Sequence, residues 1–160
     1  MSEIRLVHEY PFPPATVWLA LTDPALMRFW MVAARPEGFG ATVGTRFKFI
    51  GKPQFGWNGI VLGEVLESRA PSLLRYSWVA DEGDAMVVTY RLEPHGGGTR
   101  FTFEHTGFTG VGGLLLSKAV MTPIRKTMFG VNLPALLADL DQDGKLRSGS
   151  TLRPQFQEGP

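Results

Sequence analysis

The sequence predicts an α+β domain in which an antiparallel sheet of about six strands packs against one long C-terminal helix, with two short helices after the first strand. Three observations predict this order. The apolar residues have a helical spacing soon after the first strand, alternate with a period of two between residues 45 and 107, and return to helical spacing after residue 113. A run of strands followed by a helix is typical of α+β folds.

The first thirty residues contain one predicted strand and two predicted helices. Residues 3–10 alternate apolar and polar side chains, as a strand with one buried face does. Pro13 and Pro14 suit the start of a helix, where a missing N–H costs nothing, and apolar residues at helical spacing follow them. Asp23 and Pro24 form a second start signal, an N-cap residue and then a proline at the first helical position.

The middle of the sequence predicts a meander of strands. Alternation with a period of two indicates strands at residues 45–51, 59–68, 72–80, 85–94 and 98–107. The segments between them are short and rich in Gly, Pro, Asp and Ser, which favours antiparallel hairpins over crossover connections.

The last periodic segment predicts one long, bent helix. Leu116, Val120, Ile124, Met128 and Val131 follow one another at steps of three and four residues. Two interior prolines, at positions 123 and 134, each remove a backbone hydrogen bond and are expected to bend the helix. This helix is the natural cover for the apolar face of the sheet. Residues 144–160 show no periodicity, so we expect a domain at residues 1–143 and a flexible tail at 144–160.

The composition narrows the classes of function. The net charge is +1, with 16 basic and 15 acidic residues scattered along the chain, so a nucleic-acid partner is not expected. The sequence has no apolar run long enough to span a membrane, no signal peptide and no cysteine, which predicts a cytoplasmic protein without disulfides. Its three histidines lie on separate elements, so we expect neither a metal site nor a cofactor. A monomer and a homodimer both remain open.

Three stretches carry a resemblance to a known superfamily. Residues 14–30 contain a Pro–x–x–Val–Trp segment and a Thr–Asp–Pro turn, residues 63–78 a Gly–x–Val–x–Glu strand with a Tyr–x–Trp strand, and residues 96–108 a Gly–Thr–Arg strand. With the C-terminal helix they cover about residues 3–141. In this order and spacing, the chain resembles START-like, or SRPBCC, domains. The first two stretches look most like heat-shock-protein-activator-like domains, whereas residues 112–140 look more like the polyketide cyclase/dehydrase branch.

The resemblance implies a helix-grip fold, a curved sheet wrapped around the C-terminal helix, with a cavity for lipid-, steroid- or polyketide-like molecules. The alternation on the strands points several aromatic side chains toward that helix, and Trp57 is a further aromatic candidate. Our predicted ligand-binding residues are Phe29, Trp30, Phe47, Phe49, Tyr76, Trp78, Tyr90, Phe101, Phe103, His105, Met121, Ile124 and Met128. No residue is assigned a catalytic or metal-binding role.

His105 has three open interpretations. It shares a strand face with Phe101 and Phe103, so the sequence predicts an inward-pointing imidazole. It could be a structural histidine, it could orient the polar end of a ligand because imidazole both donates and accepts, or it could act as a general acid–base. An acid–base role requires a partner, for which Tyr76, Tyr90 and Glu64 are the candidates.

Four charged side chains near the predicted cavity also have alternative placements. Glu64 and Glu67 have opposite parity on their strand, so one of them is expected to face inward. Arg125 and its neighbour Lys126 are expected on the solvated face of the last helix. In the other rotation of that helix, one of them would meet an acidic head group at the cavity mouth.

The sequence therefore favours a protein that binds a small hydrophobic molecule in an internal cavity. One alternative is a cyclase or dehydrase in which His105 moves a proton. The other is an interaction module like the chaperone-activator domains, with a cavity filled by its own side chains.

Overall fold

The computed structural model describes residues 2–53, 58–80, 85–108 and 120–156. Its strands are β1 (Ser2–Tyr10), β2 (Ala34–Glu37), β3 (Arg46–Gly51), β4 (Ile60–Arg69), β5 (Leu73–Ala80), β6 (Met86–His95) and β7 (Gly98–Phe108). Its helices are α1 (Pro14–Thr22), α2 (Pro24–Trp30), α4 (Thr122–Thr127), the π-helix η2 (Met128–Asn132) and α5 (Leu133–Ala138).

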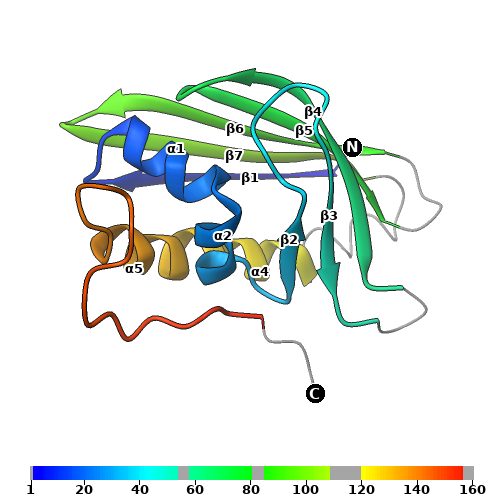
Figure 1. The fold of residues 1–160 in the computed structure, drawn as a ribbon. Helices are drawn as coiled ribbons and strands as arrows, with labels where there is room; N and C mark the ends of the chain where they lie inside the picture. Colours follow the sequence, from blue (N-terminus) through cyan, green and yellow to red (C-terminus); the bar gives the residue numbers. More distant parts are fainter. Residues whose placement is uncertain (1, 54–57, 81–84, 109–119, 157–160) are drawn as a thin grey trace.

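The strands form one antiparallel sheet in the order β1-β7-β6-β5-β4-β3-β2. The sheet curls around the C-terminal helix, while α1 and α2 lie beside that helix near one end of the sheet (Figure 1). This arrangement confirms the predicted α+β helix-grip fold.

The structure adds β2, which the alternation did not indicate. This strand is short and contains Pro36, which has no N–H to donate to a neighbouring strand. Among the described strands, β2 lies at the edge of the sheet beside β3, and a proline is tolerated at such an edge.

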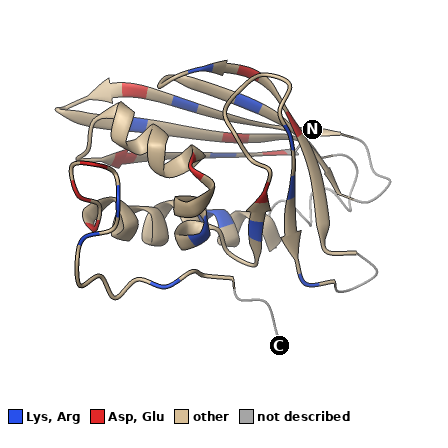
Figure 2. Ribbon diagram, viewed as in Figure 1, with Lys and Arg blue, Asp and Glu red and all other residues tan. Residues whose placement is uncertain are grey.

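The outer face of the sheet carries charges of both signs. Figure 2 shows acidic and basic residues interspersed along the strands. Arg91 on β6 pairs with Glu104 on β7 at 3.6 Å, and Arg75 on β5 pairs with Glu67 on β4 at 3.2 Å. Such exposed cross-strand pairs contribute little to stability, and they keep this face in water.

The two short helices begin as the sequence predicts. Pro14 opens α1 and Pro24 opens α2, where the Asp23 carboxylate accepts a hydrogen bond from the backbone N–H of Ala25 at 2.9 Å. Trp30 ends α2 and is almost fully buried, and its indole N–H donates to the carbonyl of Ala20 in α1 at 2.8 Å. The indole therefore fixes the two helices against each other.

The C-terminal helix is continuous from α4 through η2 to α5, with a π-helical segment in its middle. Pro134 lies in the first turn of α5, directly after that segment. The buried Tyr10 hydroxyl of β1 donates to the carbonyl of Phe129 in η2 at 2.7 Å. This bond ties the helix to the first strand where the regular α-helical pattern is interrupted.

The buried stripe of this helix differs from the predicted one. Val120 and Val131 were predicted to face the sheet, but their side chains are 51% and 63% exposed. Arg125, Phe129 and Leu133 are buried instead. From η2 onward the α-helical spacing fails because a π-helical segment rotates the following residues relative to a regular α-helix, so Val131 is exposed and Leu133 is buried.

The core lies between the inner face of the sheet and the helices. It is built from aromatic side chains on the strands, such as Phe101 and Phe103, from Phe129 on η2, and from leucines on α5, such as Leu136 and Leu137. None of the helices in the described ranges has the length and hydrophobicity needed to cross a bilayer.

The described part of the predicted tail, residues 144–156, lies along the domain. Leu146 forms a β-bridge with Leu140, and the N–H of Gln155 donates to the carbonyl of Arg28 at 2.9 Å. Leu152 packs against the core and Phe156 is only 8% exposed. The division of the chain at residue 143 stays a prediction, which these contacts make testable by deletion.

Candidate functional site

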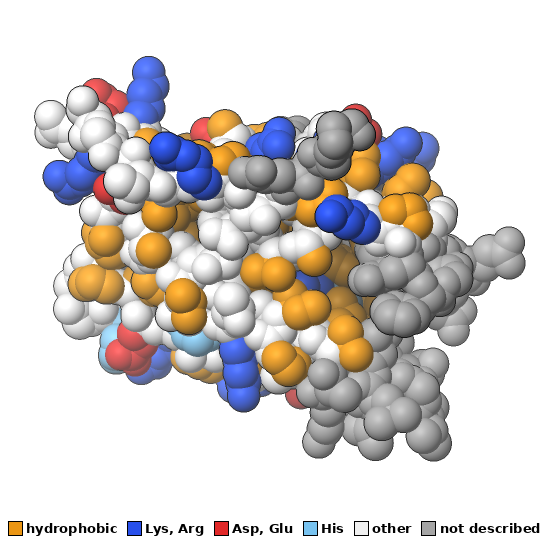
Figure 3. Space-filling model, turned by 90° about the horizontal axis from the view of Figure 1, so that it is seen from below, with side chains coloured by type: hydrophobic (Ala, Val, Ile, Leu, Met, Phe, Trp, Pro, Cys, Tyr) orange, Lys and Arg blue, Asp and Glu red, His pale blue; other side chains and the backbone are white. Residues whose placement is uncertain are grey.

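A cavity of about 860 Å³ lies between the inner face of the sheet and the start of the C-terminal helix. Its walls come from the end of α2, from β3 to β7, from α4 and η2, and from the chain near residue 156. Figure 3 shows hydrophobic side chains gathered around a hollow on this face of the molecule, with basic atoms visible inside it. The lining residues are Trp30, Met31, Val32, Ala33, Ala34, Phe49, Lys52, Val61, Tyr76, Trp78, Ala80, Met86, Tyr90, Phe103, Val120, Met121, Ile124, Arg125, Met128, Phe129, Gln155 and Phe156.

Most of the predicted ligand-binding residues lie on these walls. They are Trp30, Phe49, Tyr76, Trp78, Tyr90, Phe103, Met121, Ile124 and Met128. Period-two alternation brings together the aromatic rings on β5, β6 and β7, since each of these strands turns one face toward the helix.

The remaining predicted residues do not line the cavity. Phe101 is fully buried in the core, where its ring packs against Phe129 at 5.1 Å. Phe29 is half-buried and packs on the edge of the core. Phe47 lines a separate hollow of about 420 Å³, whose other lining residues come from β2, β3, β4 and the chain after β2. Trp57 lies outside the described residues.

Two tyrosines form the polar centre of the aromatic wall. The hydroxyl groups of Tyr76 on β5 and Tyr90 on β6 are 3.1 Å apart and hydrogen-bonded to each other. Burial raises the pKa of Tyr76 to about 12, although the hydrogen bond to Tyr90 and the charge of Arg125 act in the opposite direction. Burial also raises the pKa of Tyr90 well above its ordinary value. Both phenols therefore remain protonated at neutral pH and can donate hydrogen bonds.

Arg125 on α4 is the functional candidate whose position the sequence misplaced. We expected it on the solvated face, but its side chain lines the cavity and the residue is only 7% exposed. Its guanidinium carbon lies 4.9 Å from the centre of the Trp78 ring and 5.8 Å from that of Phe103, as in cation–π contacts. The available signal was the alternative stripe of Met121, Arg125 and Phe129, which are four residues apart.

The guanidinium of Arg125 is incompletely satisfied. Its Nη1 donates weakly to the sulfur of Met128 at 3.7 Å, and its buried Nη2 has no hydrogen-bond partner within the described part of the chain. Burial lowers the pKa of Arg125, while the nearby phenols of Tyr76 and Tyr90 act to raise it. An arginine remains protonated in proteins, so the cavity contains a buried positive charge.

His105 lies inside the protein but is not among the residues that line the cavity. It shares the buried face of β7 with Phe101 and Phe103, as the alternation predicts, and it is fully buried. Its ring packs 5.0 Å from the ring of Trp78, and neither ring nitrogen has a partner among the described residues. Burial, and then the charge of Arg125, lower the pKa of His105 well below its ordinary value. The imidazole is therefore neutral at physiological pH.

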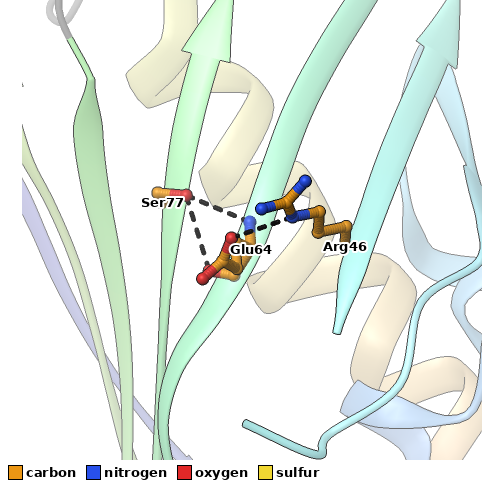
Figure 4. Close-up of polar contacts among 3 residues, drawn as sticks. All are labelled: Arg46, Glu64 and Ser77. Carbon is orange, nitrogen blue, oxygen red and sulfur yellow. Dashed lines mark hydrogen bonds and ion pairs between the residues drawn. The ribbon is translucent and has the colours of Figure 1, made fainter. Parts of the chain in front are cut away.

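The two glutamates of β4 both lie away from the cavity, so the expectation that one faces inward is wrong. Glu64 pairs with exposed Arg46 at 3.2 Å, and the backbone N–H of Glu64 donates a hydrogen bond to the hydroxyl oxygen of Ser77 at 3.0 Å (Figure 4). Glu67 pairs with Arg69 at 2.6 Å. A β-bulge between Val65 and Glu67 inserts one extra residue, which reverses the parity after it.

Within the described ranges, no group of three or more His, Asp or Glu side chains is arranged to hold a metal ion. The cavity is instead an apolar site with a small polar centre made of Arg125, Tyr76 and Tyr90. Such a centre can fix the orientation of a bound molecule whose larger part is apolar.

Comparisons with solved structures agree with the fold. Protein MLL2253 from Mesorhizobium loti is 26% identical, with a TM-score of 0.73 over 88% of this chain and 99% of that one. DynU16, from the dynemicin biosynthetic locus, is 20% identical, with a TM-score of 0.69 over 86% of this chain and 48% of that one. PFC0360w, an HSP90 activator from Plasmodium falciparum, is 18% identical, with a TM-score of 0.61 over 86% of this chain and 95% of that one.

Comparison at the level of sequence identifies the family. A search of the curated proteins found none that matches the chain. The model of the Activator of Hsp90 ATPase homolog 1-like protein family matches residues 11–115, which is well over half of the chain. The match covers all three stretches on which the superfamily resemblance rests. The chain therefore belongs to the Activator of Hsp90 ATPase homolog 1-like family, on the heat-shock-protein-activator-like side of the START-like superfamily.

Proposed function

We propose that this protein binds a small hydrophobic molecule in the cavity between the sheet and the C-terminal helix. The observation that carries the proposal is the cavity itself, which has a volume of about 860 Å³ and walls made mainly of aromatic and aliphatic side chains. Cavities that bind small molecules commonly measure ~300–1,000 Å³ and combine apolar walls with a few polar groups.

The cavity also supports binding over the two alternatives. An interaction module needs no internal space, yet side chains leave this space empty in the described structure. A proton-transferring His105 needs a partner and access to the bound molecule. The imidazole is not on the cavity wall and has no hydrogen-bond partner among the residues described.

A matched pair of tryptophan variants tests this proposal. Ile124 lines the cavity, whereas Val131 is on the same helix but outside it and is 63% exposed. Binding of a neutral naphthylamine dye is measured by its fluorescence. We expect the wild-type protein to bind the dye with a Kd in the micromolar range, near −8 kcal/mol. Ile124→Trp fills part of the cavity and should weaken binding at least tenfold, whereas Val131→Trp should bind as the wild type does.

Two results would count against the proposal. A folded wild-type protein that takes up no neutral apolar dye has no usable cavity. Equal affinities of the wild type and Ile124→Trp would place the dye somewhere else on the protein. Circular dichroism confirms that both variants are folded before the affinities are compared.

A further inference from the structure

The charged side chains described on the cavity wall are all positive. Of the described residues that line it, the two charged ones, Arg125 and Lys52, are both basic. Lys52 is exposed to solvent, whereas Arg125 on α4 is buried. A buried charge is costly unless a group of opposite charge accompanies it. No acidic side chain in the described ranges forms an ion pair with Arg125.

The free hydrogen-bond donors of the cavity come from the helix and from the sheet. Arg125 has a buried Nη2 without a partner in the described part of the protein. Tyr76 and Tyr90 share one hydrogen bond, which uses only one of their two hydroxyl protons. The other phenol proton is available to a bound molecule. The site thus offers one guanidinium and one phenol, and both donate hydrogen bonds.

This set of donors fits a carboxylate. A guanidinium presents paired N–H groups that match the two oxygens of a carboxylate, and the single positive charge neutralises a single negative one. A phosphate monoester carries close to two negative charges at neutral pH and three acceptor oxygens, for which one buried cation is a poor match. The aromatic walls around these donors leave the rest of the space to an apolar body.

We infer that the molecule bound in this cavity is a hydrophobic carboxylic acid, whose carboxylate pairs with the guanidinium of Arg125 while its apolar part fills the space below the sheet. The inference rests on the proposed function and specifies the class of ligand. An aliphatic acid and an aromatic acid share the required chemistry, so the test includes one of each.

The experiment compares two acids with their neutral counterparts. Decanoate is paired with decan-1-ol, and 2-naphthoate with 2-naphthalenemethanol, and each Kd is measured by titration calorimetry. Arg125→Met removes the charge and keeps an unbranched side chain. Lys126→Met is the matched control, because Lys126 is the next residue on the same helix but is exposed.

We expect the wild-type protein to bind at least one acid about 10- to 100-fold more tightly than its alcohol, as a hydrogen-bonded charge pair allows. Arg125→Met should abolish this preference while changing the Kd of the alcohol less than about threefold. Lys126→Met should retain the preference. The pair that shows the larger preference identifies the aliphatic or the aromatic class.

Other outcomes would overturn the inference and still leave the proposed function standing. In one, the wild type binds the acid and the alcohol equally well. In another, Arg125→Met retains the preference for the acid. If Arg125→Met does not fold, Arg125→Gln is used, and it must lose the preference in the same way. If no acid or alcohol binds to the wild type, both the inference and the proposed function fail.

Discussion

At the scale of single residues, Arg125 is costly to the folded protein. Its guanidinium is removed from water, contacts aromatic rings and has an unsatisfied Nη2 among the described residues. Replacing buried charges with well-packed apolar side chains is often neutral or stabilising, by up to about 4 kcal/mol. A residue of this kind is expected where function requires a charge.

We therefore predict that Arg125→Met raises the stability of the unliganded protein. The free energy of unfolding should increase by ~1–2 kcal/mol, because the lost cation–π contacts offset part of the gain. Urea denaturation measures this change. Lys126→Met should stay within about 0.5 kcal/mol of the wild type, as exposed substitutions do. A marked loss of stability in Arg125→Met would mean that the guanidinium has a structural role.

His105 shows what the sequence could predict for a single side chain and what it could not. Alternation along the last strand correctly placed the imidazole on the buried face with Phe101 and Phe103. Whether the imidazole reaches the cavity depends on which other side chain lies between His105 and the cavity. Trp78, on a different strand, packs against His105 and itself lines the cavity. The alternation along one strand shows which side chains share a face, but it does not show which side chains of other strands pack against them.

At the scale of elements, regular periods predicted most of the fold, and their local interruptions caused the errors. Apart from β2, the described strands and the two short helices were predicted close to their observed bounds, because the period within each element is regular over most of its length. The bulge in β4 and the π-helix η2 each shift the period within an element. The first shift explains the misplaced glutamate of β4, and the second explains the exposed Val131. Arg125 precedes η2, and its burial corresponds to the other rotation of the helix that the sequence left open.

For the chain after α5, the sequence and the structure lead to different predictions about stability. Without periodicity, residues 144–160 were expected to be a flexible tail. Because Leu152 and Phe156 pack against the domain, we now predict that deleting residues 147–160 lowers the free energy of unfolding by ~1–3 kcal/mol.

Thermal denaturation, followed by circular dichroism, measures the effect of that deletion. A shorter deletion of residues 158–160 retains Phe156 and is the control, for which we expect the wild-type melting temperature. If the longer deletion also melts at the wild-type temperature, residues 147–156 contribute no stability and the tail predicted from the sequence is correct.

At the scale of the whole molecule, all of the tyrosines belong to the core. The sequence has 3 tyrosines, at positions 10, 76 and 90, and each is buried. Burial raises the pKa of every one of them, to about 12 for Tyr76. The folded protein therefore keeps its phenol protons at a pH where the unfolded chain, with pKa values near 10, releases them.

This difference predicts alkaline unfolding. Above about pH 10 the unfolded state binds fewer protons than the folded state, so the free energy of unfolding falls as the pH rises. For Tyr76 alone, a rise of the pKa from 10.0 to about 12 corresponds to roughly 3 kcal/mol. Absorbance at the phenolate band should rise together with the loss of circular dichroism, in one transition. A phenol that titrates near pH 10 while the protein remains folded would contradict the burial of that tyrosine.

The pairing of β1 with β7 has a consequence for how the protein is made. β1 is synthesised before the rest of the sheet, but its hydrogen-bonding partner begins at Gly98. At about 5–20 residues per second, β1 waits several seconds on the ribosome before that partner exists. The Tyr10 hydroxyl waits longer still, because its acceptor belongs to Phe129. Nascent chains arrested before the last helix should therefore be sensitive to proteases over their whole length, and protection should appear late in translation and all at once.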